Sequence, residues 1–164
     1  MYILRERFLG LGEDAEITNE SGVPVFYVDQ KLLSVRDRLI MRDAAGRELA
    51  QVVRKMAALR PAYEILIDDL PAAEVRKRLF TAFGDRFTID IPGLHDLEIV
   101  GDLLDHEFRI TRAGTVVGTV SRRWISLRHT YAVEILPGEN DLLILASLLA
   151  MDLARDRERE HEHG

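Results

Sequence analysis

Arginine and lysine side chains stand in tight groups in this chain, and they are the residues best suited to chemistry on a charged ligand. The groups are Arg54-Lys55, Arg76-Lys77-Arg78, Arg122-Arg123 and Arg128-His129. On a strand, alternate side chains point to opposite faces, so Arg76 and Arg78 share one face and Lys77 lies on the other. If their strand lies near Arg122 or Arg123, the guanidinium forks could hold a phosphorylated lipid headgroup or another anion. The alternative is a solvated outer surface on which nearby acids neutralise each group.

Trp124 and the five histidines are the other side chains that could bind a ligand or a metal ion. Trp124 follows Arg122-Arg123 and could anchor the chain at an interface, but a lone tryptophan in a β protein usually packs inside it. His106 lies between Asp105 and Glu107, yet adjacent strand residues face opposite ways and cannot converge on one ion. We therefore expect packing for Trp124, a structural role for His106 and no metal site.

The sequence offers no constellation for catalysis. It has no cysteine, no phosphate-loop glycine pattern, no GxSxG elbow and no HExxH helix. The carboxylate pairs Asp68-Asp69 and Asp102 with Asp105 fall in predicted turns, where aspartate is common for backbone reasons. We predict a protein that is not an enzyme, with no catalytic residue and no cofactor.

Composition and charge narrow the class of protein further. Of the 164 residues, 47% are hydrophobic and 30% are charged, which is enough apolar mass for one buried core. The 22 basic and 28 acidic side chains give a net charge of -6. A protein of negative net charge does not attract nucleic acid through its overall electrostatic field. The lack of cysteine fits a reducing compartment, and the N-terminal run has no apolar stretch of signal-peptide length. We expect a cytoplasmic protein, with the membrane periphery as a possible place of action.

The elements that must position these side chains are mostly strands. Short runs of alternating apolar residues, separated by turn residues, recur about every 8–12 residues from Tyr2 to Ile135. Three turns carry a glycine suited to a hairpin, whereas residues 68–71 and 91–93 contain proline and predict looser connections. The pattern predicts strands at 2–8, 14–18, 25–28, 38–42, 48–54, 62–66, 73–79, 85–90, 96–100, 106–111, 116–122 and 131–135, with hairpins at 19–22, 43–46 and 112–114.

The last segment predicts a helix of unusual composition. Strong helix formers fill Asn140–Ala154, and Asn140 and Asp141 can cap its first turn. Leu142 to Leu145 already cover a full turn, so the helix is hydrophobic on every side and must be enclosed. Its uninterrupted apolar run from Leu142 to Met151 is too short for the roughly 20 residues that a bilayer requires, so we expect no transmembrane span.

Strands and helix together predict one architecture. A closed antiparallel barrel of about twelve strands has a backbone diameter of roughly 24 Å, too wide for its own side chains to fill. A helix about 10–12 Å across fills that space. We therefore predict a single mainly β domain over residues 1–155, with a central helix at about 140–155 and a charged, fraying tail at 156–164.

Several segments of the chain together resemble the LURP-one-related family, whose fold is that of the tubby C-terminal domain and is distantly related to phospholipid scramblases. The similar segments are Tyr2–Phe8, Glu48–Ala50 with Lys55 and Pro61–Tyr63, Phe87–Asp90, Gly101–Phe108, Ser121–Ser126, Thr130–Ile135 and Asp141–Ala146. The resemblance implies a twelve-stranded barrel around a C-terminal helix. It also implies contact with lipids, because tubby domains bind phosphoinositides through basic surface residues and scramblases act on lipids. The chain lacks the cysteine-rich and proline-rich segments of the scramblases, which argues against lipid scrambling.

These observations lead to one preferred function and two alternatives. We predict a binding or scaffold module that recognises an anionic ligand or a phospholipid headgroup through Arg76, Arg78, Arg122 and Arg123, or that binds a protein partner. The first alternative is a lipid- or nucleotide-acting enzyme with a site in loops at a barrel end. The second is DNA contact, which the acidic composition disfavours.

Overall fold

β-Branched and aromatic residues alternate with polar ones along short segments, and each such segment forms a strand of one closed barrel. The computed structural model describes residues 1–5, 15–31, 38–56, 60–78, 85–102, 107–121, 130–162 and 164. Within them the strands are β1 (Tyr2–Arg5), β2 (Ala15–Asn19), β3 (Pro24–Lys31), β4 (Arg38–Arg42), β5 (Glu48–Arg54), β6 (Ala62–Ile67), β7 (Leu70–Lys77), β8 (Asp85–Asp90), β9 (Leu97–Asp102), β10 (Glu107–Arg112), β11 (Thr115–Ser121) and β12 (Thr130–Ile135). All twelve predicted strands are confirmed.

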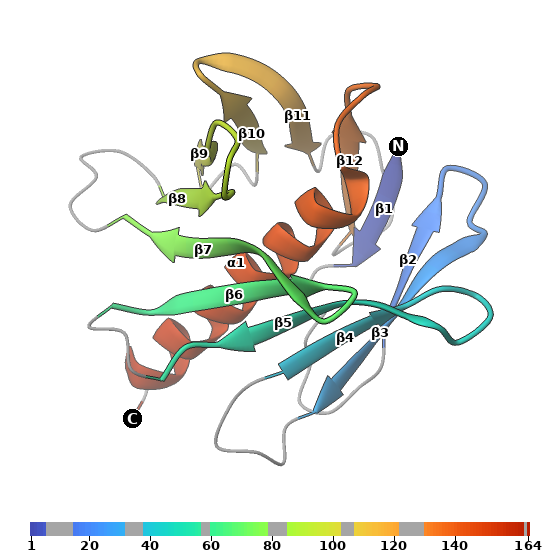
Figure 1. Cartoon of the computed structure of the whole chain (residues 1–164), viewed down its shortest axis with the longest axis horizontal. Coiled ribbons are helices and arrows are strands. Elements are labelled where there is room, and N and C mark those ends of the chain that lie inside the picture. The colour runs from blue at the N-terminus through green and yellow to red at the C-terminus, as the bar shows by residue number, and fades with distance from the viewer. Residues whose placement is uncertain are drawn as a thin grey trace.

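The barrel is antiparallel throughout and follows the order of the sequence. Each strand pairs with its neighbours in the chain, and β1 closes the sheet against β12, with Tyr2 opposite Val133. The predicted closed barrel of twelve strands is therefore confirmed (Figure 1). Because the strands alternate in direction, six connections lie at one end of the barrel, which we call the turn end: residues 20–23, 43–47, 68–69, 91–96, 113–114 and 136–140.

Local backbone chemistry explains the tight hairpins at the turn end. Asn19 and Asp43 each accept two backbone N–H hydrogen bonds through the side-chain Oδ1 at 2.9–3.0 Å. The turns that they open contain Gly22 and Gly46 at φ +77° and +83°, a region that favours glycine. The hairpins predicted at these turns, and the one at 112–114, are confirmed by the antiparallel pairing of their strands.

The connection between β6 and β7 differs from the looser one predicted at residues 68–71. Asp68 and Asp69 both adopt positive φ, at +50° and +62°, and Ile67 pairs directly with Leu70. Aspartate tolerates this conformation because its short side chain can hydrogen-bond locally. Pro71 is accommodated within β7 beside a register shift, where the ladder is already irregular. The proline thus lies inside the strand and does not end it.

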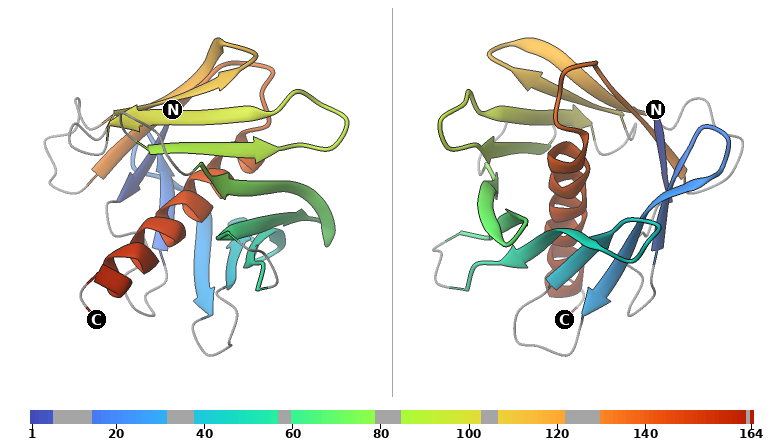
Figure 2. Two further views of the ribbon diagram at one scale, coloured as in Figure 1. Left: turned by 90° about the vertical axis from the view of Figure 1, so that its left-hand side faces the viewer. Right: turned by 45° about the vertical axis from the view of Figure 1, so that its right-hand side comes forward.

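The helix α1 (Asp141–Glu162) fills the barrel. The side-chain Oδ1 of Asn140 accepts the backbone N–H of Leu143 at 3.1 Å and caps the first turn. The helix runs to residue 162 and so extends through most of the segment predicted as a fraying tail. Arginine and glutamate are good helix formers, and the ion pair of Glu158 with Lys77 on β7 holds this end at 2.6 Å. Figure 2 shows α1 surrounded by strands in two further views.

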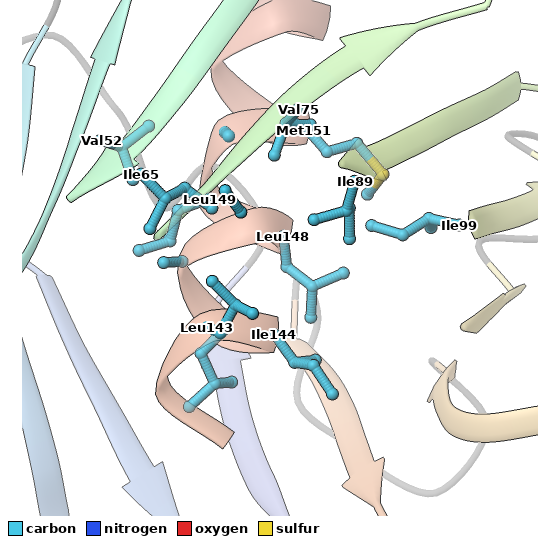
Figure 3. Packing of buried hydrophobic residues seen from close by; sticks show 14 of the residues in the cluster. Val52, Ile65, Val75, Ile89, Ile99, Leu143, Ile144, Leu148, Leu149 and Met151 are labelled. Atoms are coloured by element: carbon cyan, nitrogen blue, oxygen red, sulfur yellow. The ribbon is translucent and has the colours of Figure 1, made fainter. Parts of the chain in front are cut away.

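The core lies between the helix and the inward faces of the strands. Every residue from Leu143 to Met151 is buried, and Leu145 and Ala146 have no exposed surface. Figure 3 shows leucine, isoleucine and methionine side chains of α1 directed at apolar side chains from the strands. This arrangement confirms that a helix with no polar face in its first half is enclosed on all sides, and it leaves the outer face of the barrel for other roles.

We expect Leu145→Asp to unfold the protein. The change places an unpaired carboxylate where the side chain is wholly buried, and such a charge costs about 3–5 kcal/mol or more against a total stability of about 5–15 kcal/mol. Thermal melting followed by circular dichroism measures the effect. Leu136→Asp introduces the same group at a side chain that is 52% exposed and should melt like the parent. A cooperative melt of the Leu145 variant close to the parent's would contradict the enclosed helix.

Tyr2 ties β1 to the start of α1, which leads to a second prediction. Its hydroxyl donates to Asp141 Oδ2 at 2.6 Å, and burial followed by this hydrogen bond and the carboxylate's charge raises the pKa of Tyr2 to about 12. Tyr2→Phe should cost about 1 kcal/mol at neutral pH. Because the folded pKa is raised, the contribution of Tyr2 is complete below pH about 10 and is lost as the pH rises towards about 12.

Urea unfolding of the parent and of Tyr2→Phe at a series of alkaline pH values measures this loss. The difference in unfolding free energy between the two proteins should shrink over that window. A parent–variant difference independent of pH would refute the proposed contact.

Candidate anion-binding site

Arg76 and Lys77 lie on opposite faces of β7. Val75 is 1% exposed and packs in the core, which fixes the strand so that Arg76 points outward with 60% of its side chain exposed. Lys77 points inward, where its Nζ contacts Glu158 of α1 at 2.6 Å and lies 6.0 Å from the centre of the Phe87 ring. Arg78 follows β7 and is exposed. Of the predicted site residues, the structure thus brings Arg76 and Arg78 to the outer surface.

These two arginines border an open hollow of about 570 Å³ on the outer face of β6, β7 and β8. The guanidinium Nε of Arg78 donates to Thr88 Oγ1 on β8 at 3.2 Å, which orients its side chain along the hollow. The hollow is lined by Arg60, Ala62, Glu74, Arg76, Lys77, Arg78, Thr88, Asp90 and Asp96. Two forked guanidinium groups and a hydroxyl beside one another are donors of the kind that bind phosphate oxygens.

Glu74 governs how much of this positive charge is available. Its carboxylate accepts hydrogen bonds from Lys55 Nζ, at 2.6 Å, and from Arg76 Nε. Partial burial acts to raise the pKa of Glu74, but the two hydrogen bonds and the positive charges of Lys55 and Arg76 together outweigh it and leave the pKa below its usual value. The same contact raises the pKa values of Lys55 and Arg76. The alternative interpretation, in which nearby acids neutralise the basic groups, therefore applies to Arg76. Arg78, by contrast, pairs with no acid among the described residues.

The strand register brings acids together around Glu74. Glu74 lies opposite Glu64 of β6 on one side and opposite Asp90 of β8 on the other. Like charges at directly opposed positions repel each other, and Lys55 and Arg76 relieve this repulsion. Arg76 in turn feels the nearby charge of Asp90. The hollow therefore combines cations and acids.

Arg122 and Arg123 lie outside the described residues, as do Trp124, His106 and Arg128-His129. β11, which ends just before Arg122, is separated from β7 by three strands. At a strand spacing of about 4.8 Å, β7 and β11 are roughly 19 Å apart along the sheet. The strand adjacency on which a single four-arginine site depends is absent, and the part that concerns Arg122 and Arg123 stays a prediction.

Arg60, Glu74 and Thr88 line the site but were not singled out from the sequence, whereas Lys55, which pairs with Glu74, was noted there as part of Arg54-Lys55. The proximity of Glu74 to Arg76 has a local signal, because residues two apart on a strand share a face. Thr88 has no such signal, since it comes from β8 and only the pairing register places it beside β7. Arg60 has none either, because it precedes β6 and reaches the hollow only through the fold.

Inside the barrel, a small apolar cavity of about 40 Å³ lies between α1 and the strands β1, β10, β11 and β12. Arg155, only 8% exposed, lies at its wall with its guanidinium carbon 5.7 Å from the centre of the Phe108 ring. Ligand sites for small molecules are usually about 300–1,000 Å³. This cavity is therefore a gap in packing, and the outer hollow is the stronger candidate site.

Two further findings concern metals and membranes. In the part of the chain that the structure describes, no three His, Asp or Glu side chains are grouped closely enough to hold a metal ion. Over the same residues, no helix combines the length and apolar character needed to cross a bilayer.

The matches to known proteins span nearly the whole chain. A family model described as LURP-one-related matches residues 1–152. A protein of Bacillus subtilis (strain 168) named "Uncharacterized protein YxjI" is 29% identical over 150 residues, which are 92% of this chain and 90% of that relative. The family match includes all twelve strands, the first half of α1 and every residue that lines the outer hollow.

The Glu74 network predicts a pH-dependent contribution to stability. Glu74→Gln should lower the unfolding free energy at pH 7 by about 1 kcal/mol or less, because both partner cations are substantially exposed. Since the pKa of Glu74 is lowered on folding, this contribution is present above its usual value of 4.5 and is lost as the pH falls below it. Urea unfolding at pH 7 and at about pH 3 measures the change.

Glu107→Gln on β10 is the matched control, since Glu107 is exposed on another strand. Equal stability of parent and Glu74→Gln at pH 7, or a difference that persists in acid, would contradict the assigned network.

Proposed function

The chain belongs to the LURP-one-related family, and from this premise we propose that it is a non-enzymatic binding module that recognises phosphate. The phosphate belongs to a phospholipid headgroup or to another anionic ligand, and it binds in the outer hollow between β6, β7 and β8. The observation that carries this proposal is the outward placement of Arg76 and Arg78 beside the Thr88 hydroxyl in that hollow.

The packing of the interior supports a site on the outer face. α1 occupies the space that a carrier protein of barrel form would use for its ligand, and the gap beside it is about 40 Å³. A phosphate must also keep its charge solvated or paired, and the buried side of the strands is apolar. The outer hollow provides charge, hydrogen-bond donors and access together.

The availability of Arg78 supports phosphate as the recognised group. Arg78 donates a hydrogen bond to the neutral hydroxyl of Thr88. A phosphate oxygen can replace this hydroxyl as the acceptor and forms a stronger, charge-assisted hydrogen bond. Arg60, at the same end of the hollow, adds a second exposed guanidinium. The enzyme alternative, with a site in barrel-end loops, stays a prediction.

Titration of the full chain with inorganic phosphate, at constant ionic strength in chloride, tests the proposal. Backbone amide signals of Ala62 and Thr88 should shift in nuclear magnetic resonance spectra and should saturate. In Arg76→Gln/Arg78→Gln these shifts should disappear. The melting temperature should fall only slightly, because both side chains are exposed and the ion pair of Arg76 with Glu74 contributes about 1 kcal/mol or less. Arg109→Glu, which reverses an exposed charge on β10, should bind like the parent. The absence of saturable shifts in the parent would overturn the proposed function.

Sedimentation with phosphatidylcholine vesicles that contain phosphatidylglycerol, an anionic lipid with one phosphate, distinguishes a lipid headgroup from a soluble anion. Binding to lipid should fall as sodium chloride is added, because the charges are exposed and screened by salt. In the same assay, Arg122→Glu/Arg123→Glu tests whether those arginines take part.

A further inference from the structure

The charges of the outer hollow are separated by sign along the barrel. Arg60 and Arg78 lie away from the turn end, where β6 begins and β7 has ended. Asp90 and Asp96 lie at the turn end, on either side of the connection between β8 and β9. The hollow therefore has a positive end and a negative end.

The pairing register places the middle of the hollow between these ends. Arg76 lies opposite Thr88, and Glu74 lies opposite Asp90. The two rows are about 6.6 Å apart, since a strand rises about 3.3 Å per residue. Arg76 and Glu74 pair with each other across the rows, which leaves Arg78 and Asp90 as the exposed charges that flank the pair.

The balance of charge argues against a polyanionic ligand. Among the described lining residues, three arginines (60, 76 and 78) face three acids (74, 90 and 96), because Lys77 is directed inward to Glu158. A ligand with several phosphates would bring negative charge against the acids at the turn end. A ligand that carries one anionic and one cationic group would complement both ends of the hollow.

The lining also distinguishes between kinds of cation. Quaternary ammonium groups are usually recognised by the faces of aromatic rings, and no aromatic side chain is among the residues that line the hollow in the described chain. A primary ammonium group has three N–H donors that a carboxylate can accept. Asp90 is exposed and forms no hydrogen bond to the described residues, whereas Asp96 Oδ1 accepts the backbone N–H of Ile91 at 3.4 Å. Asp90 is thus the better acceptor.

We propose that the hollow selects a phosphate linked to a primary ammonium group, as in ethanolamine phosphate and its phosphodiesters. The phosphate binds at Arg78 and Arg60, and the ammonium group binds at Asp90. Arg78 lies two rows, about 13 Å, from Asp90 along the strands, but its guanidinium reaches Thr88 in the row between, which is one row from Asp90. A phosphate, a two-carbon linker and an ammonium group together span about this one row. The inference rests on the proposed phosphate-binding function and goes further, because it names the chemical class of the ligand and the residue that selects it.

Calorimetric titration of the full chain with ethanolamine phosphate, choline phosphate and inorganic phosphate at equal ionic strength tests the selection. Ethanolamine phosphate should bind about two- to fivefold more tightly than either of the others, the range that one exposed ion pair supplies. Asp90→Asn should remove this preference and leave the affinity for inorganic phosphate unchanged or slightly higher. Glu107→Gln, which removes an exposed carboxylate on β10, should retain the preference.

The outcomes separate this inference from the function on which it rests. Equal affinity for the three ligands, or a preference that survives in Asp90→Asn, would overturn the selection while phosphate binding stands. Absence of binding by all three would overturn both. Because Asp90 is exposed, the variant should melt like the parent, so a loss of preference reports on the site.

The source of the ligand is resolved by a vesicle assay. Sedimentation with vesicles that contain phosphatidylethanolamine in phosphatidylcholine, but not with phosphatidylcholine alone, supports a lipid headgroup as the ligand. Binding of soluble ethanolamine phosphate without such sedimentation supports a soluble ligand and overturns the lipid source.

Discussion

Enclosure of an apolar helix is the constraint on which the rest of this structure depends. From Leu143 to Met151 every side chain of α1 is buried, so no face of this segment can meet water without a large loss of hydrophobic free energy. Twelve strands form a barrel wide enough to surround it, and a barrel of that size needs such a helix to fill it. The first half of α1 and the inward strand residues share one buried cluster, so we expect them to fold as a single cooperative unit.

This constraint also decides where function can reside. A filled interior removes the usual ligand cavity of a β-barrel, so a proposed ligand site belongs on the outer face or at the barrel ends. Along β7 the side chains alternate between core and solvent, so Val75 anchors the strand and Arg76 is exposed on the outer face. The same alternation turns Lys77 inward, where it secures the far end of α1 through Glu158. One strand thereby serves both packing and the candidate site.

Electrostatics across the sheet shape the site more than any single basic cluster does. The carboxylates of Glu64, Glu74 and Asp90 lie on neighbouring strands and would repel one another in the absence of cations. Lys55 and Arg76 compensate through Glu74, which consumes part of the positive charge that the sequence shows at residues 76–78. What remains for a ligand is a hollow with separated charges, a property that arises from three strands together.

The sequence alone determined the strand count, the enclosed helix and the exposure of Arg76 on one face of its strand, because hydrophobic period and turn chemistry are local properties. It misjudged the turn at Asp68-Asp69, where positive φ at two aspartates and a register shift beside Pro71 make a tight hairpin. Only the tertiary structure decided that Arg60, Glu74, Thr88 and Asp90 share a hollow and that β7 and β11 are not neighbours. Which residues face each other across strands depends on register and barrel closure, and these are set by the packing of the whole chain around α1.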